Sequence, residues 1–229
     1  SLGLNSNRDA WVYNFSKEKL RNNIKNTIAF YNSEVNRYKA ACAEITKSNW
    51  PNTENFTSND ETKIKWASSL RDDFGRQKVG NYHENRLISS IYRPFQKEWL
   101  YFDNMFNHRV GQMPRIFPDA TADNRVICVT GRGATKDFCA FISDTLPDLE
   151  MVSKSQCFPL KLYEKNSVQD ESSESGDMHD DLFGNSQLES ISIEAKYTVK
   201  DGITEAGLAH FQSVYPTEAI NKEDVFYYI

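Results

Sequence analysis

A segment rich in arginine and aromatic residues lies between residues 86 and 136 of this 229-residue chain. It contains eight cationic residues and only four acidic ones, which gives it a net charge of +4. The planar guanidinium of arginine can bind a guanine edge or a phosphate through two hydrogen bonds. Aromatic residues such as Tyr92, Phe95 and Trp99 are interleaved with these cations. This composition is typical of a nucleic-acid-binding surface, and the alternative is a solvated charged face above an aromatic core.

A glycine-rich basic stretch runs from Gly131 to Lys136, directly after an apolar run at 126–129. It lacks the Gly-Lys-Ser/Thr ending of a phosphate-binding P-loop, so it predicts a tight basic turn after a strand. The backbone N–H groups of such a turn, together with Arg132 and Lys136, could bind a phosphate. The alternative is a plain surface turn.

A second kind of chemistry is suggested by Asp148, Glu194 and Lys196. In Mg²⁺-dependent nucleases, carboxylates hold the metal and a lysine helps to activate water. The pattern is loose, because a long acidic stretch separates Asp148 from the other two residues. A Mg²⁺-dependent nuclease fragment that uses these three residues is therefore kept as an alternative hypothesis.

The overall net charge of −5 is unevenly distributed along the chain. Residues 1–163 hold 23 Lys and Arg against 18 Asp and Glu, whereas residues 164–229 hold 4 against 14. The first part is thus basic, and the overall charge does not argue against a nucleic-acid partner. No apolar run approaches the roughly 20 residues that span a bilayer, so we expect no membrane partner. The four cysteines are dispersed, and Cys42, Cys128 and Cys139 lie among apolar neighbours, which predicts buried free thiols and suits a reducing compartment.

A long amphipathic helix is predicted from about Ser16 to Ile45, because apolar residues recur every three or four positions. Ser16 is a suitable N-cap, and Pro51 follows the end of the pattern. Such a helix either packs in the core or serves as a rigid spacer to another domain. A shorter helix is expected after Asn59.

After Gly80 the sequence changes to short apolar runs separated by Pro, Gly, Asn and Asp, which indicates strands and loops. Residues 164–190 are acidic and rich in serine, and they predict a flexible loop. Two short helices are expected to begin at Thr204 and Asn221. The expected fold class is α+β, with long N-terminal helices, a central β-rich mixed sheet and short C-terminal helices. The runs that predict strands are 87–92, 99–102, 125–130, 138–142 and 157–163.

Several segments together resemble one family, the type ISP restriction–modification enzymes, in their C-terminal target-recognition region. These enzymes are long, helicase-like bacterial proteins that contain an N6-adenine methyltransferase. The resemblance runs in order over nearly the whole chain. The segments that carry it are 7–16, 30–32, Tyr92-Arg93-Pro94-Phe95, 99–103, 114–118, 124–129, 147–149, Ser155-Gln156-Cys157-Phe158-Pro159-Leu160, 202–204 and 220–228.

The resemblance implies a DNA target-recognition fragment without a catalytic module of its own. It would position double-stranded DNA for N6-adenine methylation and cleavage by modules of the parent chain, including an intramolecular methyltransferase partner. We expect no cofactor in this fragment, whereas the parent would use S-adenosylmethionine, ATP and Mg²⁺. The resemblance also implies a bacterial, cytoplasmic protein. A scaffold domain of a helicase-like protein that does not bind DNA is a further alternative.

Four parts are expected along the chain, and all eight candidate DNA contacts fall in the second. Basic residues would bind phosphates, and the glutamines could read adenine edges; Arg93 could instead be structural and stabilise the turn before Pro94. The parts are a helical spacer after a methyltransferase core (1–79), a β-rich recognition core (80–163), a flexible acidic loop (164–190) and a truncated C-terminal helical segment that packs on the core (191–229). The candidate DNA-binding residues are Arg93, Lys97, Arg109, Gln112, Arg115, Arg132, Lys136 and Gln156.

Overall fold

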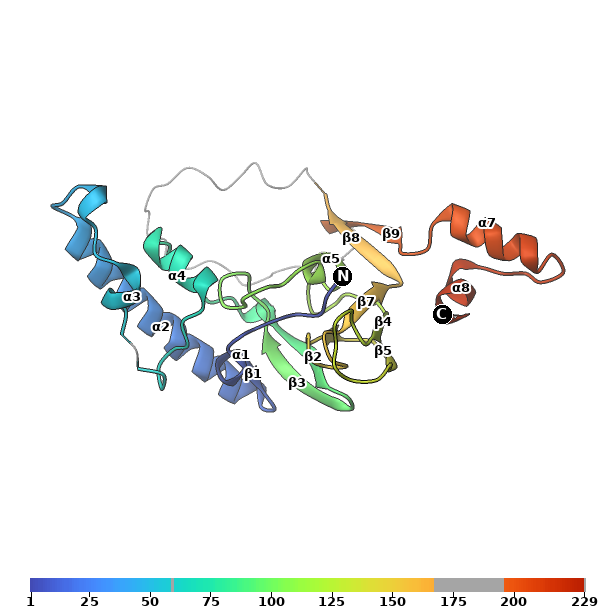
Figure 1. Ribbon diagram of the computed structural model, residues 1–229, viewed down its shortest axis with the longest axis horizontal. Coiled ribbons are helices and arrows are strands. Elements are labelled where there is room, and N and C mark those ends of the chain that lie inside the picture. The colour runs from blue at the N-terminus through green and yellow to red at the C-terminus, as the bar shows by residue number, and fades with distance from the viewer. Residues whose placement is uncertain (59, 167–195, 229) are drawn as a thin grey trace, which may run out of the picture. The chain divides into compact units, whose positions relative to one another are not determined.

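The computed structural model describes residues 1–58, 60–166 and 196–228 (Figure 1). The chain divides into two compact units, Ser1–Pro159 and Leu160–Ile229, and each is considered by itself. The expected flexible loop at 164–190 lies almost entirely outside the described residues. In the part of the chain that is described, no helix is long and apolar enough to cross a membrane. The expected four-part division stays a prediction.

The long N-terminal helix of the first unit is α2, Lys17–Cys42. It begins at Ser16, whose side-chain oxygen accepts a hydrogen bond from the backbone N–H of Lys19 at 3.3 Å. The predicted helix is confirmed, although it ends at Cys42 rather than Ile45 because the last residues form a turn. Its apolar face is buried, as the amphipathic pattern predicts. The buried apolar residues of this face are Leu20, Ile24, Ile28, Tyr31, Val35, Tyr38 and Cys42.

Two short helices after α2 supply aromatic residues that pack on it. They are α3, Thr53–Phe56, and α4, Ser68–Gly75, which is the shorter helix expected after Asn59. The fully buried ring of Phe74 lies 4.8 Å from the ring centre of Tyr38 and 5.3 Å from that of Trp66. Aromatic pairs at such distances add to the stability gained from burial. The first unit also contains α1 (Asp9–Val12) and two 3-10 turns, η1 (Lys47–Asn49) and η2 (Glu84–Arg86).

The larger sheet of the first unit has four strands in the order β1-β3-β2-β6, and its first strand lies before α2 in the chain. Its centre is an antiparallel hairpin of β2 and β3, in which Ile88 lies opposite Leu100. Strand β6 pairs with β2 in parallel, so the sheet is mixed, as the sequence predicted. The strands are β1 (Tyr13–Asn14), β2 (Leu87–Arg93), β3 (Gln96–Tyr101) and β6 (Leu146–Pro147).

A three-stranded antiparallel sheet completes the first unit, in the order β5-β4-β7. Cys128 in β4 lies opposite Phe141 in β5 and opposite Cys157 in β7. The sulfurs of Cys128 and Cys157 are 3.8 Å apart, and both are buried free thiols. The short helix α5, Met113–Ile116, precedes this sheet. Its strands are β4 (Val126–Val129), β5 (Ala140–Ser143) and β7 (Gln156–Pro159).

The described part of the second unit contains one antiparallel strand pair and two short helices. Asn221 caps α8 with its side chain, which accepts hydrogen bonds from the N–H groups of Glu223 and Asp224, and Asp224 accepts one from the Asn221 N–H in return. Thr204 caps α7 in a similar way, so both predicted helix starts are confirmed. The apolar run at 157–163 forms two strands, because β7 and β8 pair with different partners. The elements are β8 (Lys161–Lys165), β9 (Tyr197–Asp201), α7 (Glu205–Val214) and α8 (Lys222–Tyr228).

The expected α+β class is therefore confirmed, with the long helix first, several small sheets in the middle and short helices last (Figure 1).

The aromatic cluster on α2 predicts a large effect for Phe74→Ala. The substitution leaves a cavity between α2 and α4, and large-to-small changes of a buried phenylalanine cost about 3–5 kcal/mol of unfolding free energy. Denaturant unfolding followed by tryptophan fluorescence measures this loss in the first unit, since all four tryptophans lie before residue 100. The control is Phe15→Ala, because Phe15 is 71% exposed and should change stability by less than about 0.5 kcal/mol. Equal effects of the two variants would contradict this account of the core.

Candidate nucleic-acid interface

The first five residues bring together segments that are far apart in the sequence. Leu2 forms an antiparallel bridge to Gln156, and Asn5 forms another to Arg109. Between them, Leu4 bridges Asp148 in parallel. At Gly3 the backbones approach so closely that a Cβ atom would lie 2.6 Å from the carbonyl oxygen of Asp148. Two of the candidate residues, Arg109 and Gln156, therefore flank the same extended segment.

Gln112 and Arg115 join this group through the start of α5. The backbone N–H of Gln112 donates to the side-chain oxygen of Ser1 at 3.3 Å. The Gln112 side chain in turn accepts a hydrogen bond from the Arg115 guanidinium at 3.3 Å. Both side chains are exposed. Four of the eight candidates thus gather around residues 1–5.

The predicted basic turn lies between β4 and β5 and packs against the corner before β7. We call residues 130–139 together with Lys154 the basic loop. The N–H of Gly131 donates to the carbonyl oxygen of Ser153 at 3.1 Å, and a Cβ at Gly131 would lie 2.0 Å from that of Lys154. Lys154 donates from its ammonium to the carbonyl oxygen of Gly133 at 2.6 Å. The segment of Ser153 and Lys154 therefore holds the turn in place.

The basic loop presents three exposed cations, Arg132, Lys136 and Lys154. Among the residues that the structure describes, none of these three forms an ion pair. Lys154 is not one of the eight candidates that the sequence indicates. It joins the loop because β4 pairs with β7 and places Gln156 opposite Val129, and this long-range pairing has no local sequence signal. The loop and Gln156 therefore belong to the same end of the small sheet.

The two candidates in the β2–β3 hairpin have a different environment. The Lys97 ammonium lies 2.7 Å from the Asp144 carboxylate, and the Arg93 guanidinium lies 2.9 Å from that of Asp148. The Lys97 pair is exposed on both sides, and such pairs contribute little to stability. Arg93 also lies over the ring of Tyr92, 3.8 Å from its centre. These contacts agree with the alternative in which Arg93 has a structural role in the hairpin instead of binding DNA.

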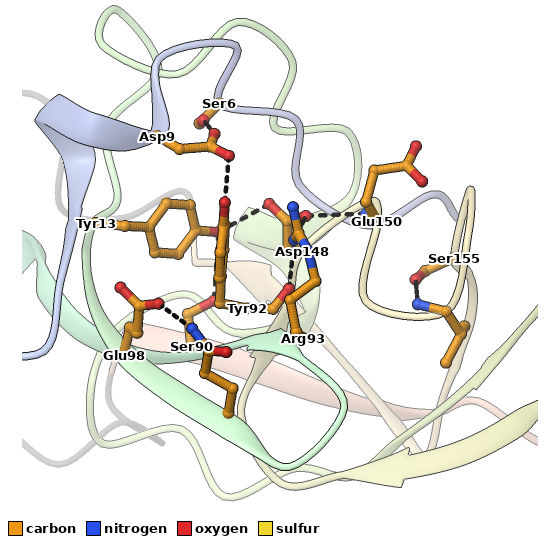
Figure 2. Close-up of polar contacts among 12 residues, drawn as sticks. Ser6, Asp9, Tyr13, Ser90, Tyr92, Arg93, Glu98, Asp148, Glu150 and Ser155 are labelled. Carbon is orange, nitrogen blue, oxygen red and sulfur yellow. Dashed lines mark hydrogen bonds and ion pairs between the residues drawn. The ribbon is translucent and has the colours of Figure 1, made fainter.

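Figure 2 shows Asp148 at the centre of a polar network with Tyr13 and Arg93. Asp148 is only 4% exposed, and its Oδ1 accepts hydrogen bonds from Arg93 and from the N–H of Glu150, each at 2.9 Å. Its Oδ2 accepts one from the hydroxyl of Tyr13 at 3.2 Å. Buried carboxylates require such partners, because an unpaired charge in the interior is costly. The network links β1, β2 and the loop after β6.

A second carboxylate extends the network toward the N-terminal segment. Asp9 accepts a hydrogen bond from the hydroxyl of Tyr92 at 2.7 Å and a close one from the hydroxyl of Ser6 (Figure 2).

Burial raises the pKa of Asp148 to about 6, although the Glu150 N–H and the Arg93 charge act in the opposite direction. Burial likewise raises the pKa of Tyr13 well above its usual value, so its hydroxyl remains a donor.

The three residues of the nuclease hypothesis do not form a described site. The carboxylate of Asp148 is buried and occupied by hydrogen bonds. Glu194 lies outside the described residues, whereas Lys196 is exposed and directly precedes β9. In the ranges that the structure describes, no group of three His, Cys, Asp or Glu residues is arranged to hold a metal ion. Cys139 is exposed.

Comparison with protein families identifies the class to which this domain belongs. A family described as the Type ISP C-terminal specificity domain matches residues 1–229. The chain therefore belongs to this family, and it is the target-recognition part characteristic of type ISP restriction–modification enzymes. No curated protein sequence matches the chain.

Three solved structures are similar to the chain. One is a nuclease-deletion mutant of the Type ISP restriction–modification enzyme LlaGI in complex with a DNA substrate mimic, with 31% identity and a TM-score of 0.66 over 71% of this chain. A DrdV–DNA complex matches all of this chain with 26% identity and a TM-score of 0.73. The Type ISP enzyme LlaBIII bound to DNA shares the fold over 99% of the chain, with 24% identity and a TM-score of 0.70. This chain spans 13%, 18% and 12% of those three chains, respectively.

The raised pKa of Asp148 predicts how stability changes with pH. Between about pH 4 and pH 6 the unfolded state loses this proton while the folded state retains it, so stability falls as pH rises and levels off above pH 6. The unfolding free energy of the wild type, relative to Asp148→Asn, should fall by about 2–3 kcal/mol across this range. Glu150→Gln is the control, because its carboxylate is exposed and its backbone N–H keeps the same hydrogen bond. A difference that rises with pH, or stays constant, would contradict the burial of an ionisable Asp148.

Proposed function

We propose that this chain is a DNA target-recognition domain that positions duplex DNA for N6-adenine methylation and cleavage by other modules of a longer type ISP enzyme. The observation that carries the proposal is the basic loop, where Arg132, Lys136 and Lys154 are exposed and form no ion pair within the described residues. A rigid loop with three available cations suits the phosphate backbone of DNA. Relatives with 26% and 31% identity were solved as complexes with DNA, which supports the same class of partner.

The candidate residues divide into two groups with different tasks. Arg132, Lys136 and Lys154 bind phosphates and fix the position of the duplex. Gln112 and Gln156 lie in segments joined by residues 1–5, and their amide groups can read base edges in the major groove. Arg109 and Arg115 flank them and contact phosphate or guanine.

The remaining candidates, Arg93 and Lys97, have carboxylate partners in the free domain. The Lys97–Asp144 pair is exposed and can be exchanged for a phosphate at little cost. Arg93 is held by the buried Asp148, so its task is to hold the hairpin in place.

Catalysis belongs to other parts of the longer protein. S-adenosylmethionine, ATP and Mg²⁺ serve the methyltransferase, motor and nuclease modules, and this domain needs none of them. The methyltransferase lies against it within the same chain and shares the duplex. The enzyme works in the bacterial cytoplasm, where its DNA substrate is found.

Salt dependence of binding tests the proposal directly. In the full-length protein, replacing Arg132, Lys136 and Lys154 together by Ala should weaken binding to duplex DNA and reduce the slope of log K against log salt by about 2–3, because each lost phosphate contact removes about 0.9. Fluorescence anisotropy with a labelled duplex pool of randomised centre measures both quantities.

The matched control removes the same amount of positive charge from the exposed side of α2. In this control variant, Lys19, Lys25 and Lys39 are replaced together by Ala. If the loop variant keeps the wild-type affinity and salt slope, the basic loop does not bind DNA. If the control variant loses as much DNA affinity as the loop variant, the overall positive charge of the protein rather than the loop attracts the duplex.

A further inference from the structure

One aromatic side chain of the basic loop is exposed and packs on no other ring among the described residues. Phe138 is 79% exposed, although a ring of this size gains stability from burial. The loop backbone on both sides of it is fixed. The Thr130 hydroxyl donates to the carbonyl oxygen of Asp137 at 3.1 Å and accepts from the N–H of Cys139 at 2.8 Å. The Thr130 N–H also donates to the carbonyl oxygen of Cys139 at 2.9 Å.

This arrangement presents the ring to solvent from a rigid frame. Thr130 holds the backbone before and after Phe138, so the point from which the ring projects is set before any partner arrives. A loop backbone that is ordered in advance loses less conformational entropy when it binds. Exposed aromatic rings on rigid loops are therefore efficient contact residues.

The charges around Phe138 indicate the kind of partner. Lys136 lies two residues before it, and Arg132 and Lys154 lie on the same loop. A second exposed ring, that of Phe95, differs in this respect. Phe95 packs edge-on against Phe141 at 5.2 Å, and the cations beside it form ion pairs. Of these two rings, only that of Phe138 lies beside cations that form no ion pair within the described residues.

We propose that Phe138 contacts the bases of duplex DNA, with its ring inserted against a nucleobase at an opened base step. Arg132, Lys136 and Lys154 bind the phosphates on either side. The proposal rests on the proposed function and adds a base contact to a loop so far assigned only to the backbone. Apolar side chains, phenylalanine among them, insert between base steps in this way, and every base offers an aromatic face.

The test measures the affinity of full-length variants for the labelled duplex pool. It also measures their affinity for a single duplex sequence that the wild type selects from that pool. Phe138→Ala should weaken binding by about 10- to 100-fold. The slope of log K against log salt should stay unchanged, because the ring carries no charge. Phe138→Trp keeps an aromatic face and should retain most of the affinity. Phe15→Ala, which removes a similarly exposed ring just before α2, should bind like the wild type.

A double-mutant cycle locates the contact. Single abasic sites are moved along the selected duplex, and each is measured with the wild type and with Phe138→Ala. At the contacted base, the loss of binding free energy caused by the abasic site and the loss caused by Phe138→Ala should not add, because each change removes the same interaction. Additive losses at every position would overturn the proposal.

The outcomes separate this inference from the function on which it rests. If Phe138→Ala binds like the wild type while the triple loop variant is weakened, the base contact is wrong and the phosphate contacts stand. If the wild type binds no duplex in a salt-dependent way, the proposed function fails, and the base contact fails with it.

Discussion

The first unit depends on the buried carboxylate of Asp148. It accepts hydrogen bonds from Tyr13 in β1 and from Arg93 at the end of β2, and its backbone forms a bridge with Leu4. One residue therefore connects the N-terminal segment, the four-stranded sheet and the loop that leads toward β7. In the low dielectric of the interior such a network is strong only when every member has its partners, and removing one leaves a buried charge unpaired.

The consequence of this connection is the position of the candidate interface. Residues 1–5 run beside Asp148 and pair at either end with Gln156 and Arg109. Strand β7 continues from Gln156 and pairs with β4, and the basic loop begins where β4 ends. The loop is thus attached to the same framework as the glutamines and arginines around the N-terminal segment. The buried polar network is therefore part of the framework that joins the segments carrying the candidate side chains.

Much of the local structure could be predicted from the sequence. The period of apolar residues predicted α2, and Ser16, Thr204 and Asn221 were recognisable as helix caps because capping is a local interaction. The candidate site was predicted only in part. The basic turn was visible from its composition, but Lys154 joins it through the pairing of β4 with β7, and the carboxylate partner of Arg93 comes from a distant loop. Cysteine burial shows the same limit, since Cys139 lies among apolar residues in the sequence and is exposed at the end of the basic loop.

The central claim is that the basic loop faces the phosphate backbone of DNA. A structure of the full-length protein bound to its selected duplex tests it most directly. The account predicts that the side-chain nitrogens of Arg132, Lys136 and Lys154 lie about 2.7–2.9 Å from phosphate oxygens, the usual length of a charge-assisted hydrogen bond. A complex in which the duplex is bound elsewhere, with all three cations facing solvent or another protein module, would contradict it.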